Sequence, residues 1–535
     1  MKPTDMGTLF EQCAERGVRT TVHLDRPFDI APERGVDHDV PGLASLVRQA
    51  AGWLAAAGAR PGERVAIVKA NHWDSVLLAC AAVRLGALPA LVAASLPAET
   101  VQLLLKRLDP AVLVTDAATL ARTREAGTDL TGLARRTLCL DRPGPGPAAN
   151  ILTVADVRGF AVPPPYRRHD DEPMVVSHTS GTTGVPKLVV HSTETLVRRL
   201  ARFEAVRWPA LGVRPNDTVV QAASFVHGRA FCWTASALCL APRRIGIVTD
   251  FDPVRAETFL RAHPPTTLEA LPSVFVGWRD LASGGASPFR DVRLFASTYD
   301  AMHPPVVRAF LAASARRFPV WMQGWGQTET GPLSFRFLTR RSVARIGDRH
   351  PTTRDLGRPL PGRVALRAVD PRTHRPVRAG EPGILVARTR SRCLGYLGEQ
   401  ERWAAKVRDG WWNTGDLGSI SRTGAVRLLD REVDAVEDLS CIELEDVIED
   451  RLPEVVECLI VGAPGQRPLP VVITGDGRLD PPAWRAAVAD LPALAEPVAL
   501  RWADVPRTGT GKARRHELAQ ALLDASGTPG SGRWT

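Results

Sequence analysis

The chain has 535 residues, 44% hydrophobic and 24% charged, so it is long enough to bury large cores and to form more than one domain. The net charge is +10, but no block of five like charges occurs, aromatic residues make up only 6%, and no nucleic-acid-binding motif is visible. We therefore expect small anionic partners and no nucleic acid. The eight cysteines form no C-x-x-C pair and the first residues carry no apolar signal segment, which predicts a cytoplasmic protein with reduced cysteines.

Helix and strand patterns alternate in the first part of the chain. The predicted helices cover residues 43–57, 73–85 and 98–108, and the predicted strands cover residues 64–68, 88–92 and 111–115. This alternation predicts a layered α/β domain with a largely parallel sheet. The longest apolar run, residues 76–96, is interrupted by Arg84, Gly86 and Pro89, as in a buried helix and strand, so we expect no membrane span. Residues 141–173 are rich in proline, glycine and charge, which indicates a surface connection.

A stretch rich in hydroxyls and glycines follows at residues 177–192. Its glycines allow backbone N–H groups to turn inward, its hydroxyls add donors, and Lys187 adds a full positive charge, so it predicts a phosphate-binding loop. Pro186 and the β-branched run after the lysine favour a loop between two strands over the common P-loop, which precedes a helix. The candidate phosphate ligands are Thr179, Ser180, Gly181, Thr182, Thr183, Gly184 and Lys187.

Lysine is rare in this sequence. Only six of the 68 basic residues are lysine, yet Lys187 and Lys512 both lie in loops rich in glycine and threonine. A compact ammonium on a flexible stem enters a crowded phosphate or carboxylate site that a planar guanidinium does not. Both lysines are therefore candidates for contacts with an anionic substrate.

Three further segments carry side chains suited to a nucleotide. In residues 323–330, Trp325 offers an aromatic face to a base, Thr328 a hydroxyl to a phosphate, and Glu329 a hard oxygen ligand to Mg²⁺. Asp416, held after a Thr-Gly turn, can accept hydrogen bonds from both hydroxyls of a ribose. A predicted strand over residues 219–223 leads to His227, which is either a pocket residue or a structural histidine.

Taken in order, these motifs resemble those of the adenylate-forming superfamily, which contains acyl- and aryl-CoA synthetases, adenylation domains of peptide synthetases and luciferases. The resemblance rests on residues 179–187, 293–300, 323–330, 409–416, 431 and 506–512. It implies that Lys187 and the loop hold the β and γ phosphates of ATP, Glu329 holds Mg²⁺, and Lys512 meets the attacking carboxylate and the α-phosphate. It also implies nucleotide or substrate contacts for His227, Thr298, Tyr299, Asp300, Trp325, Thr328, Asp416 and Arg431.

The resemblance further implies a division of the chain into parts. Residues 1–430 are expected to form a large α/β adenylation domain with a β-rich subdomain. Residues 431–524 are expected to form a small, mobile α+β cap that rotates after adenylation. Residues 525–535, rich in glycine, serine and proline, are expected to be a disordered tail.

The sequence departs from the family pattern at three places. Leu188 replaces the glycine that usually follows the lysine, residues 298–300 replace the usual Gly-Gly-Ala, and the loop after Arg431 is short and lacks glycine. In CoA-forming relatives a glycine in that last loop permits close approach of the pantetheine, so its absence counts against an ordinary CoA site.

The expected function is therefore ATP-dependent activation of a carboxylic acid as an adenylate, with pyrophosphate release and transfer to the thiol of CoA. The alternative is an adenylating enzyme that transfers to a carrier-protein thiol, an amine or another nucleophile, and the altered loop favours it. A non-catalytic nucleotide-binding protein is the third hypothesis, and the retention of Lys187, Glu329, Asp416 and Lys512 argues against it.

Overall fold

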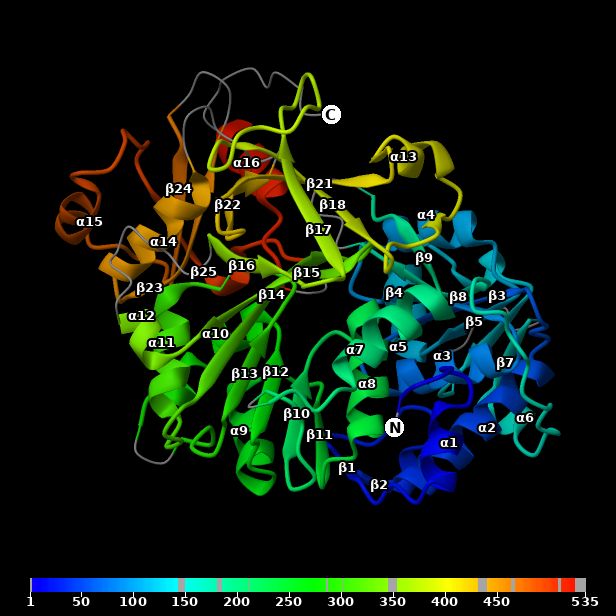
Figure 1. Ribbon diagram of the computed structural model, residues 1–535. Coiled ribbons are helices and arrows are strands. Elements are labelled where there is room, and N and C mark those ends of the chain that lie inside the picture. Colours follow the sequence, from blue (N-terminus) through cyan, green and yellow to red (C-terminus); the bar gives the residue numbers. More distant parts are fainter. Residues whose placement is uncertain are drawn as a thin grey trace.

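Three sheets and the helices that cover them make up the part of the chain that the structure describes (Figure 1). The structure is a computed structural model. The described residues are 2–142, 150–179, 185–209, 211–284, 287–300, 302–344, 354–431, 440–462, 467–508 and 511–524. The loop after Arg431, the tail at residues 525–535 and part of the phosphate loop lie outside them. The phosphate-loop residues outside the description are Ser180, Gly181, Thr182, Thr183 and Gly184.

The first sheet contains the predicted α/β alternation. Its strand order is β19-β9-β8-β4-β3-β5-β6-β7, and every adjacent pair from β8 to β7 is parallel. The strands are β3 (Arg64–Lys69), β4 (Leu88–Ala93), β5 (Val112–Thr115), β6 (Arg136–Cys139), β7 (Ile151–Thr153), β8 (Pro173–His178), β9 (Leu188–Ser192) and β19 (Gly395–Tyr396). The helices between them include α2 (Val40–Ala56), α3 (Asp74–Arg84), α4 (Ala98–Leu108), α5 (Ala117–Glu125) and α6 (Val154–Val157). The predicted helices and strands are confirmed, and the predicted surface connection also contains the short elements β7 and α6.

The second sheet runs from a parallel half into an antiparallel, β-rich half. Its order is β17-β18-β21-β22-β16-β15-β14-β13-β12-β10-β11-β1-β2, with β20 paired to β21. The parallel half contains β10 (Thr218–Ala222), β11 (Arg244–Val248), β12 (Thr267–Ala270), β13 (Leu294–Ser297) and β14 (Val320–Gln327), edged by β1 (Thr21–Leu24) and β2 (Asp37–Asp39). The antiparallel half contains β15 (Gly331–Leu338), β16 (Asp355–Pro359), β17 (Val364–Val369), β18 (Gly383–Thr389), β20 (Val407–Arg408), β21 (Trp411–Ile420) and β22 (Val426–Arg431). The predicted β-rich subdomain is confirmed.

Helix α8 joins the cores of the two large sheets. It spans Gly228–Leu240, lies between the sheets (Figure 1), and is buried along most of its length. The indole Nε1 of Trp73, the residue before α3, donates to Thr234 Oγ1 on α8 at 2.9 Å, which fixes α8 against the first-sheet region. The other helices of the large body are α1 (Leu9–Glu15), α7 (Arg202–Glu204), α9 (Pro253–Ala262), α10 (Pro272–Gly277), α11 (Pro304–Ala313), α12 (Arg340–Ala344), α13 (Gln400–Ala404) and a π-helix at Thr193–Ala201. The N-terminus of α8 is thereby held at a fixed place between the sheets.

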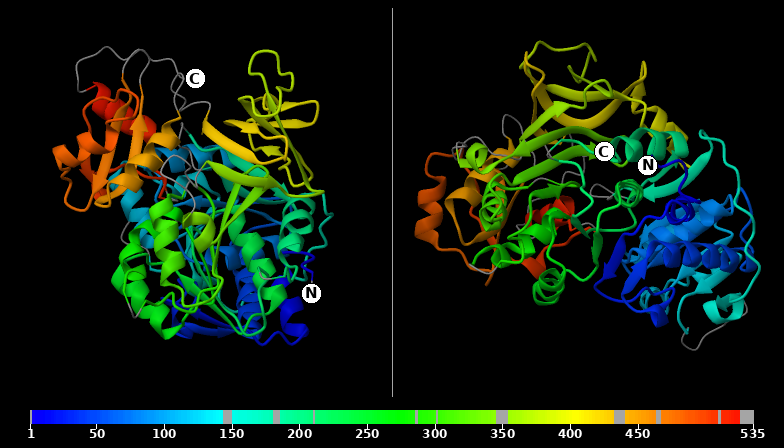
Figure 2. Two further views of the ribbon diagram at one scale, coloured as in Figure 1. Left: turned by 60° about the vertical axis from the view of Figure 1, so that its left-hand side comes forward. Right: turned by 60° about the horizontal axis from the view of Figure 1, so that its bottom comes forward.

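The last part of the described chain forms a small α+β unit. Strands β23 (Val455–Val461), β24 (Leu469–Thr474) and β25 (Val498–Arg501) form its sheet, and its helices are α14 (Cys441–Arg451), α15 (Pro481–Val488) and α16 (Arg515–Asp524). Ser440 Oγ accepts from the backbone N–H of Glu443 and caps the start of α14. The unit packs beside α11 of the large body (Figures 1 and 2).

Charged contacts join the small unit to the large body. His303 Nδ1 lies 2.8 Å from Asp446 Oδ1 on α14, and Arg308 pairs with Asp450. Burial alone would lower the pKa of His303, but the carboxylates of Glu449 and Asp446 raise it to about 10. A buried imidazolium between carboxylates therefore ties α14 to α11 in this arrangement.

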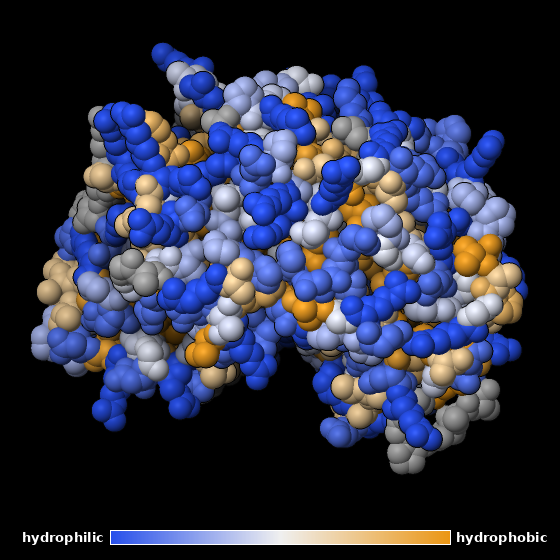
Figure 3. Space-filling model, turned by 90° about the horizontal axis from the view of Figure 1, so that it is seen from below, coloured by the Kyte–Doolittle hydropathy of each residue, from blue (hydrophilic) through white to orange (hydrophobic). Residues whose placement is uncertain are grey.

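The cysteines, the surface and the helices of the described residues have the features of a folded protein with a polar exterior. All eight cysteines are buried thiols, as predicted. The face seen in Figure 3 is mainly hydrophilic, with isolated apolar residues. Among the helices that the structure describes, none has the length and apolar character that a bilayer crossing requires.

Candidate functional site

A large cavity, of about 1280 Å³, lies where α8, the ends of β12–β14, the antiparallel half of the second sheet and the small unit meet. Every described site residue predicted from the sequence lines it. They are Thr179, Lys187, His227, Thr298, Tyr299, Asp300, Trp325, Thr328, Glu329, Asp416, Arg431 and Lys512. Segments that are distant in the sequence are thus brought together around one space.

The two ends of the phosphate loop are clamped together. Strands β8 and β9 are antiparallel, so the loop joins two strands as predicted. The backbone N–H of Thr179 donates to the carbonyl of Lys187 at 3.1 Å, and the N–H of Lys187 donates to Thr179 Oγ1 at 3.1 Å. Burial lowers the pKa of Lys187, Glu329 opposes this, and Lys406 adds to the lowering. An anion beside Lys187 would relieve this unfavourable environment.

Glu329 is held rigidly at the same end of the cavity. It is 6% exposed, and the hydroxyl of Tyr396 donates to its Oε1 at 2.6 Å. Its backbone carbonyl accepts from the N–H of Cys393 at 2.7 Å, and the neighbouring carbonyl of Thr328 lies 2.8 Å from His191 Nε2. Because these contacts fix both the backbone and one carboxylate oxygen, the other oxygen has a defined direction.

A divalent cation at Glu329 would need further ligands from a bound substrate and from water. In the described part of the chain, no group of three or more His, Cys, Asp or Glu side chains is placed to hold a metal ion. Mg²⁺ commonly binds through one or two carboxylates together with substrate phosphates and water. Glu329 suits such a role, because among the described residues a side-chain donor bonds to its Oε1 and none to its Oε2.

Asp416 and Arg431 face each other across two strands. They are paired in the register of β21 and β22, with Arg431 Nε 3.7 Å from Asp416 Oδ1. The indole Nε1 of Trp325 donates to Asp416 Oδ2 at 3.2 Å, and Thr414 Oγ1 accepts from the backbone N–H of Asp416 at 3.1 Å. Burial raises the pKa of Asp416, and Arg431 and Trp325 oppose the rise. The carboxylate is thus oriented, with a cation and an aromatic ring beside it.

Lys512 reaches the cavity from the small unit. Its Nζ lies 3.9 Å from Asp300 Oδ1 in the large body. Thr508 N–H donates to the carbonyl of Lys512 at 2.8 Å, and the N–H of Lys512 donates to Thr508 Oγ1 at 3.2 Å, so a tight turn presents the lysine. At Gly511, with φ +78°, an added Cβ would lie 2.1 Å from Ser273 Oγ on α10. A glycine is required for this close approach.

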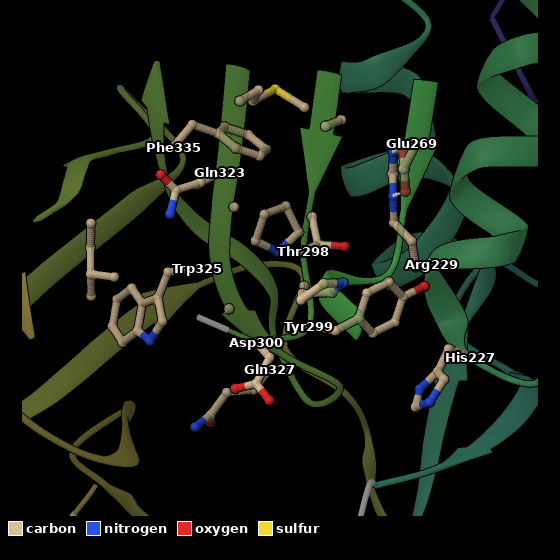
Figure 4. Close-up of a pocket in the computed structure, with 18 of the residues that line it drawn as sticks. His227, Arg229, Glu269, Thr298, Tyr299, Asp300, Gln323, Trp325, Gln327 and Phe335 are labelled. Atoms are coloured by element: carbon tan, nitrogen blue, oxygen red, sulfur yellow. Dashed lines mark hydrogen bonds and ion pairs between the residues drawn. The ribbon is translucent and has the colours of Figure 1, made fainter. Parts of the chain in front are cut away.

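His227 and Tyr299 form the opposite end of the cavity. Their rings are 5.3 Å apart and edge to face, and Tyr299 has a left-handed backbone with φ +85°. Figure 4 shows His227, Arg229 and Glu269 on one side, Trp325 on the other, and the ring of Tyr299 directed toward His227 and Arg229. Burial, aided by His178 and Lys512, lowers the pKa of His227 to about 3, so its imidazole is neutral near pH 7.

Four lining or supporting residues were not predicted from the sequence. Arg229 Nε and Nη2 donate to the two carboxylate oxygens of Glu269 at 2.7 Å each, and Arg229 also pairs with Glu204. Tyr396 is the donor to Glu329. The only available signals were that Tyr396 is one of three tyrosines and that Glu269 is the one charged residue of the strand at residues 267–270.

Comparison with known proteins identifies the family of this chain. The AMP-binding enzyme family matches residues 23–397, which is more than half of the chain. The protein belongs to the AMP-binding enzyme family. The predicted membership of the adenylate-forming superfamily is confirmed, and so are the enzyme class, an AMP-forming ligase, and the α/β fold with a smaller C-terminal domain.

Two curated relatives and one solved structure are informative about this AMP-binding enzyme. A 3-amino-2-hydroxy-4-methoxybenzoate diazotase from Streptomyces cremeus is 39% identical over 98% of this chain and 96% of its own. A 3-hydroxybenzoate–CoA ligase from Aromatoleum sp. (strain CIB) is 28% identical over 64% of this chain and 65% of its own. ATP-bound MatB from Rhodopseudomonas palustris has the same fold, with a TM-score of 0.77 at 21% identity, covering 97% of this chain and 99% of its own.

Proposed function

We propose that this AMP-binding enzyme uses ATP to adenylate a small oxyanion and then delivers the activated group to the nitrogen of an aromatic amine. The observation that carries the proposal is the 39% identity to a diazotase over nearly the whole of both chains. Diazotisation joins the nitrogen of an arylamine to the nitrogen of nitrite, so nitrite is the oxyanion we expect. The gathering of the candidate residues around one cavity supports the same proposal.

In the first step, a nitrite oxygen attacks the α-phosphorus of ATP. An O–P bond forms, the bond to pyrophosphate breaks, and the products are nitrosyl-AMP and pyrophosphate. We assign Lys512 to the attacking oxyanion and the α-phosphate, because its ammonium faces the cavity, and Lys187 with the phosphate loop to the β and γ phosphates. Fixed positive charges of this kind stabilise the charge that develops on phosphoryl oxygens. Mg²⁺ held at Glu329 would neutralise further phosphate charge.

The nucleoside is assigned to the other wall of the cavity. Asp416, oriented by Trp325 and next to Arg431, is placed to accept hydrogen bonds from the ribose hydroxyls. Trp325, Thr298 and the backbone at residues 299–300 are assigned to the adenine side, and Thr328 to a phosphate oxygen. This arrangement leaves the space beside His227 for the substrate that receives the activated group.

In the second step, the amine nitrogen attacks the nitrosyl nitrogen and AMP leaves with the bonding electron pair. Loss of a proton gives an N-nitrosamine, which tautomerises, takes up a proton and loses water to give the diazonium ion. No oxidant or reductant is needed, because nitrite already supplies nitrogen in the required oxidation state. We further propose that residues 431–524 move as a cap relative to residues 1–430 between the two steps.

A second candidate is an aryl-CoA ligase, in which an aromatic carboxylate is adenylated and passed to the thiol of CoA. The 28% identity to a 3-hydroxybenzoate–CoA ligase favours it. The short loop after Arg431, which lacks glycine, argues against an ordinary CoA site. The two candidates share the first step and differ in the oxyanion and the acceptor.

Product analysis separates the two candidates. We expect AMP and pyrophosphate to form from Mg²⁺-ATP when sodium nitrite and 3-aminobenzoate are supplied at pH 8, where the uncatalysed reaction is negligible. The diazonium product is captured with 2-naphthol as a coloured azo dye, and the dye should require enzyme, ATP, nitrite and amine together. AMP formation that needs CoA and a benzoate, and that does not respond to nitrite, would instead establish the ligase.

A further inference from the structure

We propose that three charged side chains and one hydroxyl form a recognition subsite for ring substituents that donate hydrogen bonds. The charged side chains, here called the acidic subsite, are Glu204, Arg229 and Glu269, and the hydroxyl belongs to Tyr299. The substrate class that follows is an arene carrying amino or hydroxyl groups. This inference rests on the proposed function, because it places the aromatic substrate in the half of the cavity beside His227.

The acidic subsite has more negative charge than a structural ion pair requires. Glu269 is already paired through both of its oxygens with Arg229, at 2.7 Å each. Glu204 adds a second carboxylate that uses only its Oε2 for Arg229, so the three groups together carry a net charge of −1 when ionised. Among the described residues, Arg229 bonds to Oε2 of Glu204 and no donor bonds to its Oε1, which is left available to the cavity. All three residues line the cavity.

The Glu204 side chain is only 17% exposed, so a carboxylate oxygen there without a donor is costly unless a ligand donor reaches it from the cavity. Burial raises the pKa of Glu204, and Arg229 opposes the rise, so the environment disfavours the excess charge. An aniline N–H or a phenol O–H supplies the missing donor. A carboxylate or a methyl group on the ring carries no such donor.

The hydroxyl of Tyr299 is a second polar group in this part of the cavity that lacks a hydrogen-bond partner among the described residues. Its hydroxyl is buried and makes no hydrogen bond in the described structure. The ring is held by the left-handed backbone at φ +85° and by edge-to-face contact with His227, and it points toward Arg229 (Figure 4). Buried hydroxyls without partners are uncommon in folded proteins, so a ligand atom is the expected partner.

The surroundings of these polar groups suit a flat aromatic ring. The π-helix, α7 and α8 supply apolar side chains to the same part of the cavity. They are Leu196, Leu200, Phe203, Cys232 and Trp233. A cavity with apolar walls and a few convergent polar groups is the usual form of a small-molecule site. The ring would bury its faces here while its substituents meet the acidic subsite and Tyr299.

Calorimetric titration without nucleotide or nitrite tests the subsite by itself. The probes are benzoate, 3-hydroxybenzoate and 3-aminobenzoate, and the variants are Tyr299→Phe and Glu204→Gln. We expect wild-type protein to bind the two substituted benzoates about tenfold more tightly than benzoate. Each variant should remove most of that preference and leave the Kd for benzoate unchanged.

Two variants serve as matched controls. Tyr166→Phe and Glu257→Gln make the same chemical changes at sites outside the cavity, and they should leave the preference unchanged. An undiminished preference in Tyr299→Phe and Glu204→Gln would overturn the proposal, and so would equal weakening for all three probes, which indicates a structural role. If Glu204→Gln does not fold, Tyr299→Phe decides alone. Because no ATP or nitrite is present, failure of the proposed reaction would leave these binding results intact.

Discussion

Replacing Lys512 with alanine is expected to reduce the exchange of labelled pyrophosphate into ATP by about a hundredfold or more, while ATP still binds. The ammonium enters the cavity from the small unit and lies 3.9 Å from Asp300 of the large body. It is assigned to the oxyanion and the α-phosphate, whose charge changes during the reaction. Loss of one such contact typically costs about 3 kcal/mol in the transition state. Exchange is measured with Mg²⁺-ATP and nitrite, and ATP binding by calorimetry.

The matched control for this variant is Lys106→Ala. Lys106 is an exposed lysine on α4, away from the cavity, so its removal should change neither exchange nor binding. If Lys512→Ala exchanges pyrophosphate as fast as wild type, the role assigned to this lysine is wrong. If it loses ATP binding and exchange equally, the lysine acts in the ground state and not selectively in the transition state.

Changing Glu329 to glutamine should lower the rate of pyrophosphate release by about a hundredfold, because an amide is a far weaker ligand for Mg²⁺ than a carboxylate of the same shape. Glutamine retains an oxygen that accepts from Tyr396, so the local fold should survive. The measurement is the rate as a function of Mg²⁺ concentration. We expect the variant to need more Mg²⁺ and to remain slower at saturation.

Tyr396→Phe is the control for the second variant. It removes the 2.6 Å hydrogen bond to Glu329 Oε1 but keeps the carboxylate. A loss smaller than that of Glu329→Gln is expected. Equal rates and equal Mg²⁺ dependence in Glu329→Gln and wild type would show that this carboxylate does not serve the metal.

Much of the fold could be predicted because it follows from local patterns. The helix expected over residues 98–108 is α4 with the same bounds, and the strand expected over residues 88–92 lies within β4. Helical spacing, β-branched runs and Gly/Pro stops act within a few residues, so they are visible in the sequence. No local pattern predicts that the motifs meet in one cavity. We could predict it only from the order of the motifs and from the family resemblance.

The features that the sequence did not reveal depend on tertiary contacts. Tyr396 meets Glu329 only because β19 pairs with β9 across a long separation in sequence. Glu204, Arg229 and Glu269 come from three elements, and each is unremarkable in its own segment. The direction of the Tyr299 ring depends on a left-handed backbone at a residue other than glycine, which no sequence pattern predicted.

The central claim is that the oxyanion itself attacks the α-phosphate of ATP within this cavity. Nitrite labelled with ¹⁸O in both oxygens tests it directly, because the attacking oxygen stays on phosphorus when the amine displaces AMP. Mass spectrometry of the AMP formed with 3-aminobenzoate at pH 8 should find one ¹⁸O in its phosphate. AMP without label, formed while the azo-coupled diazonium product accumulates, would contradict the account.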